Sequence, residues 1–481
     1  MPNPVNAVMN KLLPGCYSLR TSVFFMMHLL YVECPAQVLP IVQEKSSQQS
    51  FILARQLYDD GRYADALVIF QELLGADPEN ANLNFLVGDC YLLQGGFEQE
   101  ARPFLEKAVR NIVVDYQNHS LQRSAPVFAF EKLGDVYYHD YRFDDALVNY
   151  RVLKTYLDGK RDKVLQEAID AKIARAMEAG RILDAPLKMV LTEIPFVNVI
   201  SFSDFGAIMV ENGGLIFFNR RREETGATNQ GSDIYMMRKT EQKWGRPLRM
   251  SFVNSEADDM VCWASKDGDM MLIASDRDGS FDLYLSERKG KSMWTMPARL
   301  NSTVNSRADE TSGWLSGDHT TLYFVSNRKD GFGGKDIYRT ARQADGTWGP
   351  ALNLGAGINT VLDEESPFLT QDGQRLYFSS RGRGGMGGYD VFSVTMPAGD
   401  ALSAPVNAGY PVNTVGDDLF YRSFLTAKPN YLITRARVNS SASLINALND
   451  SENVATNNEV REKKPAAEKP KLKLVPKTLK Y

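Results

Sequence analysis

Residues 322–338, LYFVSNRKDGFGGKDIY, decide the fold of the larger part of the chain because they recur. The stretch 376–392, LYFSSRGRGGMGGYDVF, aligns with them without a gap, and Tyr323 and Tyr377 are 54 residues apart. Apolar runs such as LYFVS, bounded by turn residues, are typical of short β-strands. A strand pattern that returns at a fixed spacing predicts a structural repeat and not a single site.

The glycine-rich part of this repeat could be mistaken for a phosphate-binding loop. Such a loop carries Ser or Thr directly after its lysine, whereas Asp336 follows Lys335. Asp336 recurs as Asp390, and Lys335 is replaced by Tyr389. We therefore interpret the segment as a hairpin whose glycines permit turns with positive φ, with Asp336 bound to nearby backbone and Lys335 exposed.

Residues 190–440 as a whole follow this pattern, with looser copies at the start and end. The linkers between copies repeat as well, since Asn305, Asn359 and Asn413 are each 54 residues apart. Four short strands in each unit of this length predict a β-propeller, with five blades expected and six as the alternative. The segment 194–206 matches the linkers but precedes the first copy. We expect it to close the ring by adding an outer strand to the last blade.

A different repeat, with a period of 34 residues, occupies residues 47–185. Tyr63 and Phe97 are 34 residues apart, and the next copy follows after an insertion of 12 residues. Each unit has a small residue in its first helix, among them Gly88 and Gly134, where two helices approach closely. This pattern resembles the tetratricopeptide repeat, which implies a superhelix of stacked helix pairs. Residues 163–180 are expected to form a capping helix.

The two ends of the chain differ from these repeats. An apolar run followed by Ala36 predicts a signal peptide over residues 1–36, with the exported chain starting near Gln37. Cys16 and Cys34 are alternative lipidation sites. Residues 441–481 are polar and then rich in Lys and Pro, so they are expected to form a disordered tail.

The composition gives little support to catalysis or to nucleic-acid binding. A net charge of −4 lacks the basic character of proteins that bind nucleic acid. The four histidines show no metal-ligand spacing, and the sequence has no nucleophile motif. Carboxylates recur at the same place in each copy, which favours a structural role over calcium binding or glycoside cleavage. We expect no catalytic residue, no cofactor and no metal site. Cys90 and Cys262 are expected to be buried thiols.

The first helix of each repeat pair offers candidate protein-binding residues. Tetratricopeptide superhelices expose these helices along a concave groove, and positions that are not needed for packing are free to contact a partner. Tyr and Arg are the residue types that most often anchor protein interfaces. The candidates are Arg55, Tyr58, Asp89, Tyr138 and His139.

The combination of both repeats, over residues 47–440, resembles a class of Bacteroidetes periplasmic proteins. Its propeller units are similar to TolB/WD-type repeats, and the class includes PorE-like components of type IX secretion. Members usually continue into an OmpA-like peptidoglycan-binding domain, whereas a lysine-rich tail follows here, so that anchoring role is not carried over.

The resemblance implies an exported scaffold without enzymatic activity, periplasmic or associated with the outer membrane. Its partners would be envelope or secretion-machinery proteins. Two alternatives remain open, a propeller that contacts carbohydrate or peptidoglycan and a propeller hydrolase.

Overall fold

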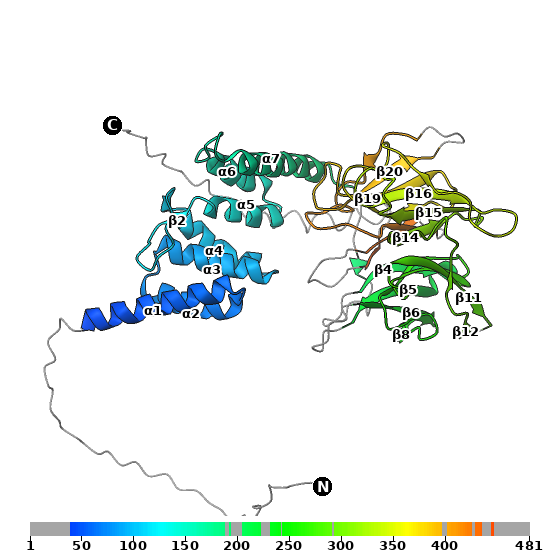
Figure 1. Ribbon diagram of the computed structural model, residues 1–481, viewed down its shortest axis with the longest axis horizontal. Coiled ribbons are helices and arrows are strands. Elements are labelled where there is room, and N and C mark those ends of the chain that lie inside the picture. The colour runs from blue at the N-terminus through cyan, green and yellow to red at the C-terminus, as the bar shows by residue number, and fades with distance from the viewer. Residues whose placement is uncertain are drawn as a thin grey trace, which may run out of the picture.

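A computed structural model describes most of the chain as a helical array followed by a set of β-sheets (Figure 1). The described residues are 39–187, 192–193, 204–222, 231–241, 243–290, 293–396, 402–425, 429–434 and 444–446. The expected signal peptide lies outside them. Within these ranges, no helix is long and apolar enough to cross a membrane.

The array consists of three helix pairs and one final long helix. Its helices are α1 (Leu39–Asp59), α2 (Tyr63–Ala76), α3 (Ala81–Gln94), α4 (Glu98–Ala108), α5 (Ala129–His139), α6 (Phe143–Lys154) and α7 (Lys163–Asp184). The final helix was expected to stop at Gly180, but α7 continues to Asp184, because a glycine inside a helix weakens it without ending it.

Close packing between helices explains the small residues of the 34-residue pattern. A Cβ atom on Gly88 would lie 2.8 Å from Leu105 Cγ, and one on Gly134 would lie 2.5 Å from a ring carbon of Tyr150. Leu105 and Tyr150 are both buried. In the second and third pairs, only glycine lets the two helices approach this closely.

The insertion between the second and third pairs folds back onto the array. It contains two short parallel strands, β1 (Ile112–Val113) and β2 (Ala125–Pro126). The Tyr116 ring packs edge-on against Phe85 of α3, and its hydroxyl donates to Asn82 Oδ1 at 2.5 Å. The insertion therefore covers part of α3.

Four antiparallel sheets, each built from one continuous stretch of chain, follow the array. The first contains β4 (Asp204–Val210), β5 (Leu215–Arg221), β6 (Ser232–Thr240), β7 (Lys243–Trp244) and β8 (Leu248–Arg249). The second contains β9 (Asp259–Ala264), β10 (Met270–Ser275), β11 (Asp282–Lys289), β12 (Met293–Trp294) and β13 (Ala298–Arg299). The third contains β14 (Glu310–Leu315), β15 (Thr321–Ser326), β16 (Asp336–Ala341) and β17 (Leu352–Asn353). The fourth contains β18 (Glu364–Leu369), β19 (Arg375–Ser380), β20 (Asp390–Thr395) and β21 (Val406–Asn407).

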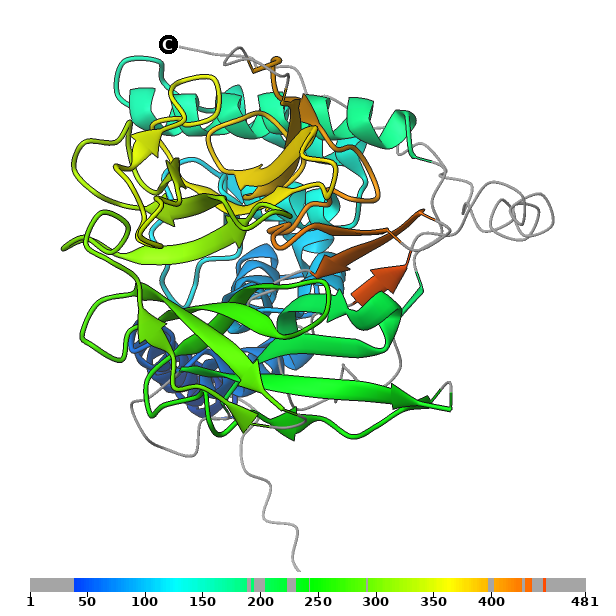
Figure 2. The same ribbon diagram turned by 90° about the vertical axis from the view of Figure 1, so that its right-hand side faces the viewer.

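A further sheet combines strands from both ends of this region. Its order is β22 (Arg422–Leu425), β23 (Pro429–Thr434), β24 (Leu444–Asn446) and β3 (Thr192–Glu193). The sheets surround a common centre in a propeller-like arrangement, with the helices behind them (Figure 2).

Three expectations about the propeller are corrected by these sheets. Instead of five or six like blades, the described residues form four continuous blades and one composite sheet, because the last repeat lacks the Gly-Asp-aromatic stretch. The strand that closes the ring is β3, which precedes the segment 194–206 that was expected to do so. The end of that segment, residues 204–206, instead forms the start of β4. The strand β24 lies beyond the expected boundary at residue 440, since its backbone pairs with β23 and β3.

The repeated linker asparagines tie each blade to the linker that follows it. Asn359 accepts a hydrogen bond from Ile337 N at 2.8 Å and donates to Ile337 O at 3.0 Å. Asn254, Asn305 and Asn413 make the same pair of bonds to residues of β6, β11 and β20. One side-chain amide thus replaces the neighbouring strand that this backbone position lacks.

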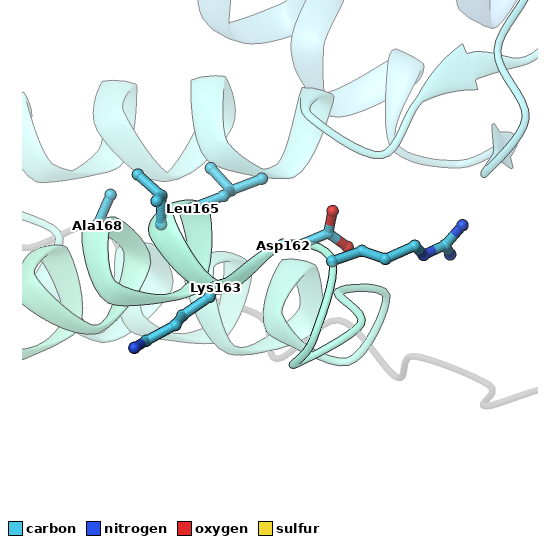
Figure 3. Close-up of a pocket in the computed structure, with 6 residues that line it drawn as sticks. Asp162, Lys163, Leu165 and Ala168 are labelled. Atoms are coloured by element: carbon cyan, nitrogen blue, oxygen red, sulfur yellow. The ribbon is translucent and has the colours of Figure 1, made fainter.

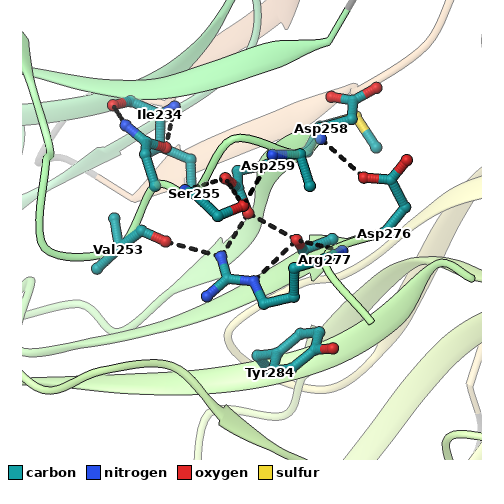
Figure 4. Close-up of polar contacts among 12 residues, drawn as sticks. Ile234, Val253, Ser255, Asp258, Asp259, Asp276, Arg277 and Tyr284 are labelled. Carbon is teal, nitrogen blue, oxygen red and sulfur yellow. Dashed lines mark hydrogen bonds and ion pairs between the residues drawn. The ribbon is translucent and has the colours of Figure 1, made fainter. Parts of the chain in front are cut away.

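The repeated carboxylates also hold the backbone. In the second blade, Asp259 accepts from Ser255 Oγ at 2.8 Å and forms an ion pair with Arg277 (Figure 4). Arg277 also donates to Val253 O at 2.8 Å, and its guanidinium lies 5.0 Å from the centre of the Tyr284 ring. The structural role expected for these carboxylates is confirmed by such bonds. Among the described residues, no group of His, Cys, Asp or Glu could hold a metal ion.

In the glycine-rich hairpin, Asp336 has the contacts expected from the sequence, whereas Lys335 does not. Asp336 accepts from Phe332 N at 2.5 Å, which confirms its backbone role. Lys335, expected to be exposed, instead forms an ion pair with Glu365 of the next blade at 2.8 Å. The hairpin lies against the following blade, and this brings the ammonium group to a carboxylate that sequence spacing alone does not connect to it.

The array and the propeller share a buried contact. Tyr138 OH donates a short hydrogen bond to Met386 O, and both side chains are buried. The Leu187 N–H donates to Tyr410 O at 2.7 Å, and the Tyr410 ring packs edge-on against Tyr141 with centroids 5.9 Å apart. Met386 belongs to the hydrophobic core of the array, so the two units meet through packed side chains.

Candidate functional site

Three of the predicted binding residues meet on the first helices of consecutive repeats. The Tyr58 hydroxyl of α1 donates a short hydrogen bond to Asp89 of α3. Arg55 lies one turn before Tyr58 on α1, and its guanidinium is 4.7 Å from the centre of the Tyr58 ring. The sequence did not single out Lys132 of α5, whose Nζ lies 2.8 Å from Asp89 Oδ1. We call Arg55, Tyr58, Asp89 and Lys132 the array cluster.

Burial and charge shape the array cluster. Asp89 is only 4% exposed, so its carboxylate depends on the hydroxyl and the ammonium group that contact it. Burial, followed by the contact with Asp89, raises the pKa of Tyr58, which keeps this hydroxyl a donor. Arg55 is partly exposed and also pairs with Asp59 at 2.7 Å. The cluster thus places a partly exposed cation against an aromatic ring whose hydroxyl is bonded to a buried carboxylate.

The insertion borders the array cluster. The Asn118 side chain lies beside the Arg55 guanidinium, and Tyr116 hydrogen-bonds to both Asn118 and Asn82. The insertion therefore covers one side of the array cluster. Sequence analysis located the insertion by its break in the 34-residue period, but the period gave no sign of where the insertion would fold.

The two remaining predicted residues lie elsewhere. Tyr138 is buried at the junction with the propeller, where it contacts Met386. His139 is exposed beside it, at the last residue of α5. The expectation of one groove formed by all five residues is corrected, because the end of α5 faces the propeller while Lys132, two turns earlier, faces α3. A protein-binding role for any of the five stays a prediction.

A second candidate is the cavity at the centre of the propeller, of about 860 Å³. The first strands of the blades contact one another around it, and the turns that follow β4, β9, β14 and β18 form its rim. The loops that contact the array, which include Met386 and Tyr410, are at the other end of these antiparallel strands. The rim is thus at the end of the propeller that the array does not contact.

Between the polar turns of its rim, the cavity is lined by apolar side chains, both aromatic and aliphatic, and by one arginine, Arg422. Trp314, Phe368 and Arg422 follow at steps of 54 residues, so Arg422 stands where the other blades carry apolar side chains. The Arg422 guanidinium lies 4.8 Å from the Trp314 ring centre and 5.9 Å from that of Phe368. Burial lowers its pKa to about 10, which leaves it a cation at neutral pH. Sequence analysis missed this residue, although the repeat alignment held the signal.

The rim of the cavity is acidic. Asp267, Asp318 and Asp372 each accept from a Ser or Thr hydroxyl two residues earlier, at 2.5, 2.5 and 2.6 Å. These bonds lower the pKa of all three carboxyls, so they are ionised near neutral pH. His319 also lines the rim, with its ring 5.1 Å from that of Trp263.

A shallow depression at the start of α7 is a weaker candidate. Asp162, Lys163, Leu165 and Ala168 line it together with neighbouring residues (Figure 3). Lys163 points away from the side on which Leu165 and Ala168 lie, so the polar groups that line the depression do not converge. Cys90 and Cys262 are free and buried, as expected.

Comparison with known proteins assigns only part of the chain. Residues 57–112 match the tetratricopeptide repeat family. No protein of curated function matches the sequence. The helical repeats in this segment are therefore of the tetratricopeptide type, as the 34-residue period predicted.

The structure is also similar to solved propeller proteins at low identity. One is assigned as TolB from Agrobacterium tumefaciens, at 17% identity over 44% of this chain and 68% of that chain, with a TM-score of 0.30. Another is the catalytic domain of an α-L-arabinofuranosidase from Coprinopsis cinerea, at 10% identity over 55% of this chain and 98% of that chain, with a TM-score of 0.37. Similarity this distant supports no conclusion about activity. The chain joins a tetratricopeptide array to a propeller-like domain.

Proposed function

We propose that the protein is a non-enzymatic scaffold of the cell envelope that binds partner proteins through its array. The observation that carries this proposal is the array cluster, in which three successive repeats place an aromatic ring and two cations around one buried carboxylate. Tyr and Arg side chains held in place by neighbouring groups are typical anchors of protein interfaces.

The junction supports the scaffold role because it joins two surfaces. Tyr138 and Met386 are buried between the units, so a partner bound to the array is held in a defined position relative to the propeller. The finer part of the proposal is a place in, or beside, type IX secretion or outer-membrane assembly, with peripheral association with the outer membrane. It rests on the resemblance in repeat combination alone.

Charge reversal at Arg55 tests the proposal. Full-length protein is cross-linked in envelope fractions, and captured proteins are quantified by mass spectrometry for wild type, Arg55→Glu and Arg62→Glu. Arg62, at the N-cap of α2, is the matched control, because it also pairs with a nearby aspartate, Asp65 at 2.6 Å, but lies outside the cluster. We expect Arg55→Glu to reduce recovery of specific partners at least tenfold and Arg62→Glu to leave it unchanged. Equal recovery from both variants would contradict the proposal.

A further inference from the structure

Arg422 differs in its partners from Arg220, the other arginine that is buried in the described part of the propeller, and from the half-buried Arg277 and Arg328. Arg220 lies 2.6 Å from Asp204, Arg328 lies 3.1 Å from Glu310, and Arg277 pairs with Asp259. Arg422 is 3% exposed, and no carboxylate in the described part of the chain lies within ion-pair distance of it. An isolated buried charge is unfavourable unless something compensates it.

The hydrogen bonds of Arg422 leave much of its guanidinium unused. It donates to Tyr421 O at 2.9 Å and, at the long distance of 3.5 Å, to Cys262 O. Its Nε has no hydrogen-bond partner within the described residues. A guanidinium has five N–H donors in a planar fork that suits the two oxygens of a carboxylate. The free donors can therefore bind an anionic group that the described residues do not supply.

The repeat does not account for Arg422. At the corresponding positions of the third and fourth blades, the aromatic rings of Trp314 and Phe368 line the cavity wall. A structural repeat predicts another apolar residue at position 422. Arg422 instead places a cation on the cavity wall, between two rings that shield it from water. Charges of opposite sign attract each other more strongly in such a poorly hydrated environment.

We propose that the central cavity binds a short peptide by its free C-terminal carboxylate, which pairs with Arg422 while an apolar side chain of the peptide packs on Trp263 and Trp314. The cationic amino end of the peptide then lies near the acidic rim. A cavity of about 860 Å³ is large enough, since ordinary small-ligand sites occupy roughly 300–1,000 Å³. The inference does not depend on the array cluster, which lies in the other unit.

The rim explains why a zwitterion is favoured over a simple anion. Asp267, Asp318 and Asp372 are ionised and surround the entrance, where they oppose the approach of an isolated anion. A ligand with a carboxylate at one end and an ammonium group at the other satisfies both the deep cation and the outer carboxylates.

Calorimetric titration of the full chain with the tripeptide Gly-Leu-Phe tests the proposal. The same peptide with a C-terminal amide, and with an acetylated N-terminus, shows which end is recognised. We expect the amide to bind at least tenfold more weakly than the free acid and the acetylated form several-fold more weakly. Equal binding of acid and amide, lack of binding by the free acid at millimolar concentration, or full competition by sulfate would overturn the proposal.

Two variants at position 422 separate binding from folding. Arg422→Leu should abolish the difference between acid and amide without lowering Tm, because it removes an unpaired buried charge. A structural arginine would instead give a lower Tm. Should Arg422→Leu fail to fold, Arg422→Lys keeps the charge but loses the planar fork, and we expect it to weaken binding about tenfold. Wild-type affinity in Arg422→Lys would contradict the assignment.

The rim has its own matched control. Asp318→Asn should weaken binding of the free peptide about threefold, whereas Asp345→Asn should leave it unchanged. Asp345 accepts from Thr347 in a similar turn, with the hydroxyl at 2.6 Å, but does not line the cavity. Arg55→Glu should bind the tripeptide like wild type, so failure of the array proposal and failure of this one give different results.

Discussion

Single glycines decide how closely the helices of the array pack. Gly134 lies against the ring of Tyr150, whose hydroxyl in turn donates to Asp135 at 2.8 Å. The ring is held by this bond and by burial, so it cannot move aside for a methyl group. Gly75, near the end of α2, has no atom within 4 Å of the place where a Cβ would stand. The same residue type thus has a packing role at one site and none at the other.

These two glycines give a paired prediction about stability. Gly134→Ala should lower the free energy of unfolding of the array by about 1–3 kcal/mol, because overpacking forces the neighbouring helices apart. Gly75→Ala should raise it by up to about 1 kcal/mol through helix propensity. Urea unfolding followed by circular dichroism at 222 nm measures both changes. A neutral Gly134→Ala variant would show that α5 and α6 are not packed as described.

Asp390 makes stability depend on pH at the junction. It is 1% exposed and accepts from Met386 N and Gly387 N, both at 2.9 Å. Burial raises its pKa from 3.8 to about 6, a shift that these two backbone hydrogen bonds and the charge of Arg175 only partly oppose. Between pH 4 and 6 the folded chain holds this proton and the unfolded chain does not. Its contribution therefore stabilises the fold at low pH and is lost as pH rises through 6.

Thermal unfolding of the propeller at pH 5.0 and 7.5 measures the effect of Asp390 on stability. Asp390 should make wild type more stable at pH 5.0 than at pH 7.5 by about 1.4 kcal/mol, since only the pH interval between 5.0 and a folded pKa of about 6 contributes. Asp390→Asn is neutral at both values and should reduce the difference. Asp345→Asn is the control, because that carboxyl is exposed and its pKa is lowered. A difference unchanged by Asp390→Asn would rule out this residue as the source.

At the scale of elements, the linker asparagines connect strands that are otherwise separate. Asn359 pairs with both backbone groups of Ile337, and both residues are buried. The 54-residue spacing identified these asparagines as a repeat, but their role as substitutes for a neighbouring strand depends on the fold. Their loss leaves a buried N–H and a buried C=O without partners.

Asn359→Ala should therefore destabilise the propeller by about 2–4 kcal/mol, as expected for two buried groups left unpaired. Gln371→Ala, at an exposed turn position, should change stability by less than about 0.5 kcal/mol. Differential scanning calorimetry compares the two. Similar small effects in both variants would mean that water replaces the asparagine amide.

At the scale of the whole molecule, two adjacent tyrosines at the end of α5 differ in the unit that their hydroxyl groups contact. The Tyr138 hydroxyl crosses to Met386 of the propeller, while the Tyr137 hydroxyl donates to Glu106 within the array at 2.9 Å. Both rings are buried, so replacement by phenylalanine removes one hydrogen bond and little else.

Tyr138→Phe should increase hydrogen exchange in residues 381–389 about tenfold, because it frees the carbonyl that anchors this loop. Tyr137→Phe should leave exchange in this loop unchanged. Mass-spectrometric hydrogen exchange on the full chain measures both. If the two variants gave equal exchange, Tyr138 would not be the contact that docks the loop on the array.

The sequence by itself determined the two kinds of repeat, because helix stacking and blade formation each impose a fixed spacing on small, apolar and turn residues. It also placed Arg55, Tyr58 and Asp89 on equivalent helices, since their positions follow from the period. Only the tertiary structure decided which side chains meet across repeats, such as Lys132 with Asp89 and Lys335 with Glu365. It also decided that the last sheet takes its outer strand from β3, and that Arg422 lines the cavity without a carboxylate partner among the described residues. Periodicity records the contacts that every unit shares, whereas a contact made once depends on how distant segments are brought together.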